Sequence, residues 1–277
     1  MINQYTVLGQ PIAHSLSPAI HHMFGELTQR RIHYTRTEAT PDTFEQIAGD
    51  FLRNGGKGCN ITAPFKQQAA KLCTKLNDSA TLAQAVNTIE VHRDGNWIGH
   101  NTDGTGLLFD IQHNKGISLS SKRILLLGAG GAARGVLAPL LKANPELVHI
   151  ANRTVERAQN LTNDFQHLGN LQSSTYDELA ESDGFDVVIN ATSMGFNNES
   201  PPTPVSVFHS NTFAYDMMYR RELTPFLQWC KQQGVEQISD GFGMLVEQAA
   251  DAYLIWEGVR PKTRKVYINS ENILNSV

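Results

Sequence analysis

The sequence predicts an α/β protein made of two domains, and three observations lead to this expectation. Short apolar runs alternate with helical patterns almost from end to end, which is typical of α/β architecture with mainly parallel sheets. A glycine-rich turn follows an apolar run and opens a helical pattern near the middle of the chain. The length of 277 residues is long for one simple domain and comfortable for two.

The first hundred residues read as strands and helices in turn. Residues 5–9 predict a strand and residues 17–29 the helix after it, with Ser17 as N-cap and Pro18 at the first helical position. Residues 88–100 alternate around Asp94-Gly95, the strongest short hairpin signal. The other elements of this part are a strand at 32–39, a helix at 43–55, a strand at 58–62, a helix after Pro64 and a bridging helix at 103–116.

The rest of the chain predicts a second α/β domain and a closing helix. Residues 123–141 form a strand, a glycine turn and a helix in which Pro139 predicts a kink or an early end. Further strands are expected at 147–154, 186–193 and 213–219, and an amphipathic helix at 243–258. The predicted layout is an amino-terminal domain over 1–103, a nucleotide-binding domain over 104–239 and a carboxy-terminal segment over 240–277.

Composition and charge exclude several classes of protein. An apolar share of 40% and a net charge of −4 give no reason to expect a nucleic acid or an anionic membrane as partner. Cys59, Cys73 and Cys230 have neither disulfide nor zinc spacing, so we expect a cytoplasmic protein without a structural metal. The amino terminus shows no signal-peptide pattern, and no run of about 18 apolar residues predicts a membrane span.

The glycine-rich turn predicts a dinucleotide site. Gly128, Gly130 and Ala133 fit G-x-G-x-x-A directly after a strand and at the start of a helix. Gly128 permits the tight turn, Gly130 lets the backbone approach a pyrophosphate, and Ala133 allows close helix–strand packing. The free N–H groups of the helix then face phosphate. A glycine turn between any strand and helix is the simpler interpretation, and the βαβ context favours the cofactor.

The end of the following strand indicates which dinucleotide binds. An NAD site usually has Asp or Glu there, which accepts hydrogen bonds from the ribose hydroxyls. This chain has Asn152, Arg153, Thr154 and Arg157 instead. A carboxylate would repel a 2′-phosphate, whereas an arginine fork pairs with it, so the sequence favours NADP. The alternative is that both arginines are solvated residues of the next helix.

Lys66 stands at an unusual place for a cation, because the amino-terminal end of a helix already carries about half a positive charge. Projected at about 100° per residue, Lys66 lies on the flank of the apolar stripe, whereas Lys71 and Lys75 lie on the opposite side. Lys66 is therefore expected to face the core or a cleft. A snorkelling lysine that covers apolar surface is the alternative interpretation, and a catalytic lysine is the hypothesis.

Three polar residues are candidate partners of this lysine or of a ligand. Asp103 is either an acid of the first helical turn or a catalytic carboxylate. Asn87 is either a turn residue or a ligand contact. Gln248 lies beside the apolar stripe of the closing helix and needs a polar partner, whereas Glu247 and Asp251 are expected to face away from that stripe.

Taken in order, these segments resemble the shikimate dehydrogenase family over nearly the whole chain. The motifs that carry the resemblance are "GQPIAHSLSPAIHH", "NITAPFK", "AVNTI", "NTDG", "GAGGAAR", "NRT", "NATSMG", "YDMMY", "TPFL" and "DGFGMLVEQAA". The resemblance implies reversible reduction of 3-dehydroshikimate to shikimate with NADPH, on the way to chorismate. It also implies two α/β domains around a cleft, a Rossmann-type NADP domain, and a last helix that returns to the first domain.

The resemblance implies a role for particular residues of this chain. Lys66 and Asp103 would be the catalytic pair, with Lys66 moving the proton at the reacting oxygen. The substrate carboxylate would be held by Ser15, Ser17 and Tyr219, and the ring hydroxyls by Thr62, Asn87 and Gln248 with support from Asn60. The NADP diphosphate and adenosine phosphate would be held by Gly128, Ala129, Gly130, Gly131, Ala132, Ala133, Asn152, Arg153, Thr154 and Arg157. Ser193, Met217 and Gly241 would lie near the nicotinamide.

Departures from the family pattern are few, and two other functions stay open. "RREL" follows "YDMMY" where many relatives have a proline, and the double methionine leaves open whether Met217 or Met218 faces the cofactor. One alternative is a quinate/shikimate dehydrogenase that uses NAD, and the other is a non-catalytic relative that senses the metabolite. A homodimer is compatible with the sequence, which leaves the oligomeric state open.

Overall fold

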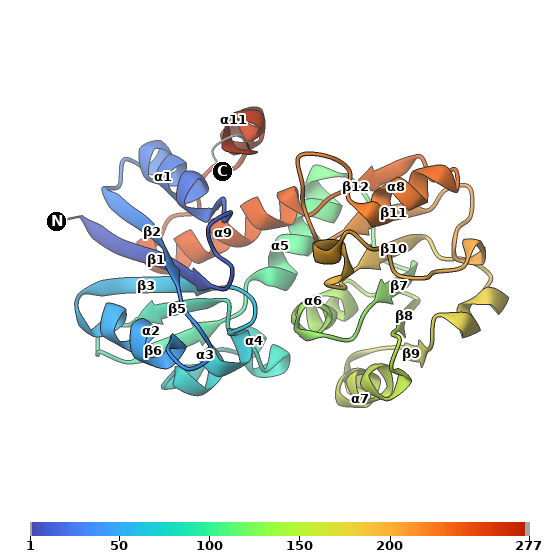
Figure 1. The fold of residues 1–277 in the computed structure, drawn as a ribbon, viewed down its shortest axis with the longest axis horizontal. Helices are drawn as coiled ribbons and strands as arrows, with labels where there is room; N and C mark the ends of the chain where they lie inside the picture. The colour runs from blue at the N-terminus through green and yellow to red at the C-terminus, as the bar shows by residue number, and fades with distance from the viewer. Residues whose placement is uncertain (1, 275–277) are drawn as a thin grey trace. The chain divides into compact units, whose positions relative to one another are not determined.

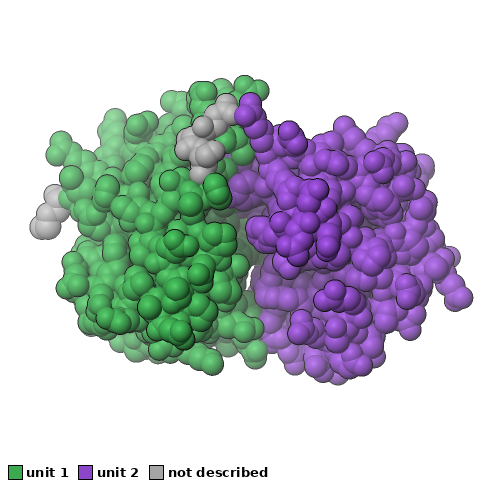
Figure 2. Space-filling view, in the orientation of Figure 1, with its two compact units in different colours: residues 1–106, 245–277 green, residues 107–244 purple. Residues whose placement is uncertain are grey.

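A computed structural model of the chain describes residues 2–274 (Figure 1). Two compact units divide the chain: the first combines residues up to 106 with those from 245 onward, and the second contains residues 107–244 (Figure 2). Both boundaries fall within helices, because α5 (Asp103–Phe109) and α9 (Phe242–Glu257) contribute residues to both units. Among the described residues, no helix has the length and apolar character needed to cross a membrane.

The first unit is built on a mixed six-stranded sheet in the order β2-β1-β3-β5-β6-β4. β1 pairs in parallel with β2 and β3, whereas β5 is antiparallel to β3 and β6. The strands are β1 Asn3–Gly9, β2 Ile32–Glu38, β3 Gly56–Ile61, β4 Lys75–Leu76, β5 Thr88–Val91 and β6 Trp97–His100. The predicted hairpin is confirmed, since Asp94 Oδ1 accepts from the Asn96 N–H at 3.0 Å and Gly95 takes a positive φ of 84°.

The helices of the first unit correct two expectations. The N-cap of α1 is Leu16 rather than Ser17, which is already the first helical residue. The helix after Pro64 is shorter than predicted, because it ends at Leu72 and Lys75 lies in β4. The helices of this unit, besides the shared α5 and α9, are α1 Ser17–Thr28, α2 Phe44–Arg53, α3 Lys66–Leu72, α4 Asp78–Ala83, α10 Arg264–Ile268 and α11 Ser270–Leu274.

The core of the first unit fixes the start of α3. Phe65, directly before Lys66, is fully buried and stacks on Phe44 of α2 with 4.7 Å between ring centroids. Ala69, one turn later, is buried as well. Burial of these apolar side chains anchors the first turn of α3 against the sheet and therefore sets where the Lys66 side chain begins.

The second unit has an all-parallel sheet in the order β12-β11-β10-β7-β8-β9, which is the doubly wound order of dinucleotide-binding domains. The order reverses between β7 and β10, and ligands bind at such a switch point in folds of this kind. The strands are β7 Arg123–Leu127, β8 Leu147–Ala151, β9 Leu171–Ser174, β10 Val187–Asn190, β11 Phe213–Asp216 and β12 Gln237–Ser239.

The helices around this sheet are α6 Gly131–Lys142, α7 Val155–Phe165 and α8 Pro225–Gln232. Short helical turns lie at 110–114, 166–168, 177–181, 194–197 and 205–207. The expectation of an early helix end at Pro139 is wrong, because α6 continues to Lys142. The Ala143 N–H still reaches the Pro139 carbonyl over 3.2 Å, so the proline ring leaves the last turn intact.

Candidate active site and cofactor-binding turn

Lys66 is the first residue of α3, two positions after the cis peptide bond between Ala63 and Pro64. Its backbone carbonyl accepts a hydrogen bond from the Val86 N–H at 2.8 Å, which ties the start of the helix to the segment before β5. The side chain is 26% exposed. The lysine is thus held at its backbone, and its side chain is partly accessible.

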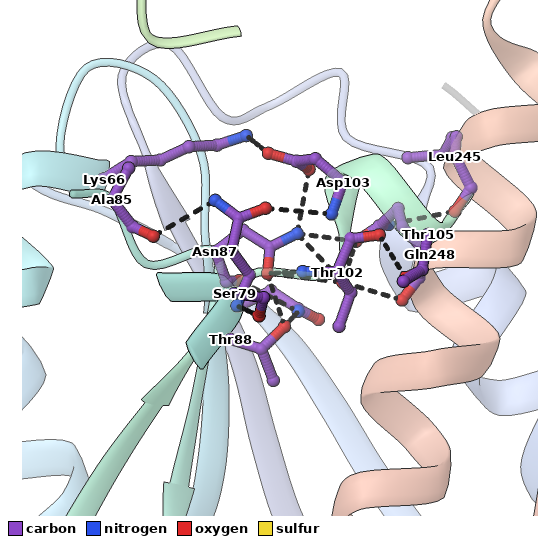
Figure 3. Close-up of polar contacts among 12 residues, drawn as sticks. Lys66, Ser79, Ala85, Asn87, Thr88, Thr102, Asp103, Thr105, Leu245 and Gln248 are labelled. Atoms are coloured by element: carbon purple, nitrogen blue, oxygen red, sulfur yellow. Dashed lines mark hydrogen bonds and ion pairs between the residues drawn. The ribbon is translucent and has the colours of Figure 1, made fainter. Parts of the chain in front are cut away.

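Asp103 pairs with Lys66 in the first unit (Figure 3). Lys66 Nζ lies 2.6 Å from Asp103 Oδ2, and the Asp103 side chain is only 8% exposed. The other carboxylate oxygen, Oδ1, accepts from Asn87 Nδ2 at 2.8 Å. A buried carboxylate that is paired on both oxygens has a fixed orientation, so the ammonium group has a fixed orientation too.

Asn87 is the centre of the surrounding polar network, which Figure 3 shows. Its Oδ1 accepts from the Thr102 N–H and from Thr88 Oγ1, each at 2.9 Å. Its Nδ2 lies 2.9 Å from Thr102 Oγ1 and 3.3 Å from Gln248 Oε1. The side chain is buried, and its amide is satisfied by protein groups on both sides.

Gln248 enters the network from α9. The Gln248 Nε2 donates to the Leu245 backbone carbonyl at 2.9 Å. The Gln248 backbone carbonyl accepts from Thr102 Oγ1 at 3.0 Å. The predicted partner for a stripe-facing glutamine is therefore provided by α9 itself and by Thr102. Lys66, Asn87, Asp103 and Gln248, far apart in the sequence, thus come together in one unit.

Asn60 at the end of β3 supports the same region. Its Nδ2 donates to the Asn87 carbonyl at 3.1 Å and to Thr88 Oγ1 at 3.0 Å, and its Oδ1 accepts from the Tyr34 hydroxyl at 2.7 Å. Burial raises the pKa of Tyr34 well above its usual value, so the phenol stays protonated and donates. With both amide protons used by protein groups, Asn60 is placed to support its neighbours.

The two serines expected at the substrate carboxylate lie at the start of α1. The Ser17 N–H donates to Ser15 Oγ over 3.3 Å, and the Ser15 carbonyl accepts from Arg36 Nε at 2.8 Å. Thr62 lies just past β3, where its N–H donates to the Leu8 carbonyl at 2.9 Å. A Cβ on Gly9 would meet Thr62 Cγ2 at 2.3 Å, so the glycine is needed for this close approach.

The glycine turn of the second unit has the geometry that its sequence predicts. Gly128 takes φ +101°, and a Cβ there would meet Thr192 Cγ2 at 3.1 Å. Gly130 is the N-cap of α6, and a Cβ on Gly130 or Gly131 would meet nothing within 4 Å. The open side of this turn and the N–H groups of the first turn of α6 fit a bound pyrophosphate. Ala133 is fully buried, as close helix–strand packing requires.

The arginines after β8 are exposed. Asn152 Nδ2 donates to the Thr154 carbonyl at 2.8 Å, and Thr154 is the N-cap of α7. Within residues 2–274, neither Arg153 nor Arg157 has an ion-pair or side-chain hydrogen-bond partner. Two unpaired guanidinium groups beside the strand end fit the 2′-phosphate of NADP.

The three residues expected at the nicotinamide lie on separate segments of the second unit. Ser193 precedes the short turn at 194–197, Met217 follows β11, and Gly241 follows β12. The Met217 N–H donates to the Asn190 carbonyl at 2.9 Å. A Cβ on Gly241 would come within 2.2 Å of the Met217 carbonyl oxygen, so these two segments touch through their backbones. Tyr219 belongs to this unit and lies in the same loop as Met217.

Glu247, which is expected to face away from the apolar stripe of α9, lies on a face of the helix that is covered as well. Glu247 is fully buried, with Arg260 Nη2 at 2.7 Å and the Tyr267 hydroxyl at 2.9 Å. Arg260 Nε also reaches Asp251 at 3.0 Å, so the segment after α9 covers this face of the helix. An amphipathic projection of α9 alone could not show that a later segment supplies a cation there.

Sequence reasoning missed Thr102 and Tyr34 as members of the network. Thr102 stands next to Asp103, and Tyr34 reads as an inward-facing residue of an alternating strand, so neither carries a local signal. Within the described part of the chain, no group of three or more His, Cys, Asp or Glu side chains could hold a metal ion.

Two protein-family models and a named relative match this chain. The model described as "Shikimate dehydrogenase substrate binding domain" matches residues 7–89, and "Shikimate / quinate 5-dehydrogenase" matches residues 110–197. The NADP(+) shikimate dehydrogenase of Nitrosomonas europaea is 49% identical over 265 residues, which cover 96% of this chain and 95% of that protein.

Two solved structures share the fold over nearly the whole chain. An Ael1 enzyme from Pseudomonas putida superposes with a TM-score of 0.90 at 44% identity, over 96% of this chain and 97% of that one. Shikimate 5-dehydrogenase from Thermus thermophilus in complex with NADP(H) and shikimate has a TM-score of 0.87 at 30% identity, over 99% of this chain and 100% of that one.

Proposed function

Because this chain belongs to the shikimate dehydrogenase family, we propose that it catalyses the reversible reduction of 3-dehydroshikimate to shikimate with NADPH. It is an NADP-dependent oxidoreductase that acts on a small-molecule substrate in the route to chorismate. The observation that carries the proposal is the Lys66–Asp103 contact of 2.6 Å, which holds an ammonium group in a fixed place beside a buried carboxylate.

Lys66 moves the proton of the reaction. NADPH, when bound, supplies a hydride to the substrate carbonyl carbon. The carbonyl oxygen gains negative charge as its π bond breaks, and Lys66 Nζ donates a proton to it, so that the product is a neutral alcohol. In the reverse direction the same amine accepts the proton. Asp103 orients the lysine and accepts a hydrogen bond from a substrate hydroxyl.

The remaining ligands of the first unit bind and orient the substrate. Ser15 and Ser17 hold its carboxylate, and neutral hydroxyls recognise this anion without adding a full charge to the site. Thr62, Asn87 and Gln248 bind the ring hydroxyls, and Asn60 supports Asn87 from behind through the 3.1 Å bond to its carbonyl. Positioning of this kind lowers the entropic part of the barrier.

The second unit supplies the groups that hold NADP. The turn from Gly128 to Ala132 and the first turn of α6 bind the diphosphate, and Gly130 and Gly131 leave room for it. Arg153 and Arg157 pair with the 2′-phosphate, beside Asn152 and Thr154. Ser193, Met217 and Gly241 contact the nicotinamide end.

A spectrophotometric assay at about 340 nm tests the function. Shikimate and quinate are each offered with NADP⁺ and with NAD⁺, and we expect the highest kcat/KM for shikimate with NADP⁺. A preference for quinate or for NAD⁺ would favour the quinate/shikimate alternative, and no turnover with any pair would favour a metabolite sensor. Three free cysteines fit the cytoplasmic location that we propose, and a native mass measurement would detect the homodimer that the sequence allows.

A further inference from the structure

Arg220 joins two loops of the second unit that carry expected nicotinamide contacts. Its Nη1 donates to Asn198 Oδ1 at 3.0 Å, and its Nη2 donates to the Gly195 carbonyl. Gly195 and Asn198 belong to the turn that follows Ser193, whereas Arg220 stands three residues after Met217. One half-buried guanidinium group thus bridges two segments that are more than 20 residues apart in the sequence.

The backbone beside Arg220 extends the connection to the third segment. The Gly241 N–H donates to the Met218 carbonyl at 3.0 Å. Asp240 is half-buried, and desolvation raises its pKa, whereas the nearby Arg220 backbone N–H opposes that rise. Arg220 therefore contacts, by side chain or backbone, the segments of Ser193 and Gly241 while it lies in the loop of Met217.

The turn after Ser193 and the loop of Met217 also pack against each other beside Arg220. A Cβ on Gly195 would lie 2.7 Å from Met218 Sδ, so the methionine sulfur rests directly on the glycine. The Met218 N–H is fixed by Asp216 Oδ1 at 3.0 Å. Met218 thus packs against protein groups. Met217 is therefore the methionine of the pair that we assign to the cofactor.

We propose that Arg220 is a positioning residue that fixes the nicotinamide end of the cofactor site. The inference rests on the proposed function, since it takes NADPH as the ligand. Arg220 opens the "RREL" stretch that directly follows "YDMMY". Its planar guanidinium fork bonds two groups of the neighbouring turn at once, which fixes the placement of one loop against the other.

The test compares NADPH with 2′,5′-ADP, which has the adenosine and 2′-phosphate groups but no nicotinamide. Dissociation constants are measured by calorimetry for the wild type and for Arg220→Ala, Arg220→Lys and Arg221→Ala. Arg221 is the matched control, because it is exposed and its side chain has no hydrogen bond or ion pair among residues 2–274.

We expect Arg220→Ala to weaken NADPH binding about tenfold, as for a lost hydrogen bond to a charged group, and to change 2′,5′-ADP binding less than about twofold. Arg220→Lys, which keeps the charge but loses the fork, should fall between, and Arg221→Ala should match the wild type. An Arg220→Ala variant that keeps wild-type NADPH affinity, or loses both ligands equally, would overturn the inference. A wild type that binds neither NADPH nor 2′,5′-ADP would instead count against the proposed function.

Discussion

Asn87 donates a hydrogen bond over 2.8 Å to Oδ1 of Asp103, the carboxylate oxygen opposite the one that holds Lys66. The aspartate therefore cannot turn toward solvent without breaking a buried hydrogen bond, which costs about 1–3 kcal/mol. Lys66 itself sits at a helix start, where the macrodipole disfavours a cation. The carboxylate fixed by Asn87 is what compensates this placement.

Lys66→Met should lower kcat for shikimate oxidation by about 10²–10⁴, because it removes the proposed proton-transfer group and leaves a hydrophobic stem in place. Shikimate should still bind, since its other ligands remain, and steady-state kinetics with an equilibrium binding measurement would check both parts. Lys71→Met is the matched control, because Lys71 lies on the exposed side of the same helix. A Lys66→Met enzyme with near-wild-type kcat would refute the assignment.

Arg153→Ala should raise KM for NADPH about tenfold or more and leave KM for NADH nearly unchanged, because only NADPH has the 2′-phosphate that we propose this guanidinium binds. Initial-rate kinetics with both cofactors measure the ratio. Arg31→Ala, a change of an exposed arginine in the first unit, serves as control. Equal effects on the two cofactors would argue against 2′-phosphate recognition by Arg153.

Gly130→Ala should weaken cofactor binding without loss of stability, whereas Gly241→Ala should lower the stability of the fold. A Cβ on Gly130 meets no protein atom and its φ of −90° suits alanine, so this variant should keep its melting temperature and lose NADPH affinity. A Cβ on Gly241 would press on the Met217 backbone at 2.2 Å, so that variant should lose about 1–3 kcal/mol of stability. Thermal melting and cofactor titration of both variants check the pair, and the reverse pattern would contradict it.

His21 should make the protein less stable as the pH falls below about 6.5. The side chain is fully buried, and burial, with a smaller contribution from His22, lowers its pKa to about 3. Between these pH values the unfolded chain binds the proton and the folded chain does not, so the free energy of unfolding falls by about 1.4 kcal/mol per pH unit from this group. Above pH 6.5 both states are neutral and the effect vanishes.

Chemical denaturation of the wild type and His21→Leu between pH 4 and pH 8 would measure this slope. The variant should show a shallower fall below pH 6.5, whatever its stability at neutral pH. His167→Leu, at an exposed position, should keep the wild-type slope. Parallel curves for wild type and His21→Leu would show that His21 does not titrate as described.

The strands and helices with strong periodicity could be predicted, and three short edge strands, β4, β9 and β12, could not. The buried strands after Arg123 and Phe213 carry continuous apolar runs, and the hairpin carries its Asp-Gly turn. β9 and β12 carry no continuous apolar run, because each pairs on one side only and each keeps an exposed and a partly exposed residue. β4 is two residues long and exists only because β6 lies beside it.

The part of the candidate site that could be predicted is the side of α3 on which Lys66 lies, because helical periodicity is read from the local sequence. Projection of α3 was enough to separate Lys66 from Lys71. The partners of Lys66 were not predictable in this way, because Asp103 and Asn87 reach it through the pairing of strands far apart in the sequence. The same limit explains Glu247, whose environment is set by Arg260 and Tyr267 and not by its own helix.

Through Glu247, the segment after α9 is bonded to the unit that contains Lys66 and Asp103. Arg260 neutralises a carboxylate that sits next to Gln248 in the sequence and is closed off from water. Loss of the Arg260 side chain alone would leave that carboxylate buried without its cation, at a cost of about 3–5 kcal/mol. A chain that ends before Arg260 would instead expose this face of α9 to water. A purification tag is therefore better joined after residue 277 than put in place of the segment from Arg260 to Tyr267, because that segment covers Glu247 although it carries no proposed ligand.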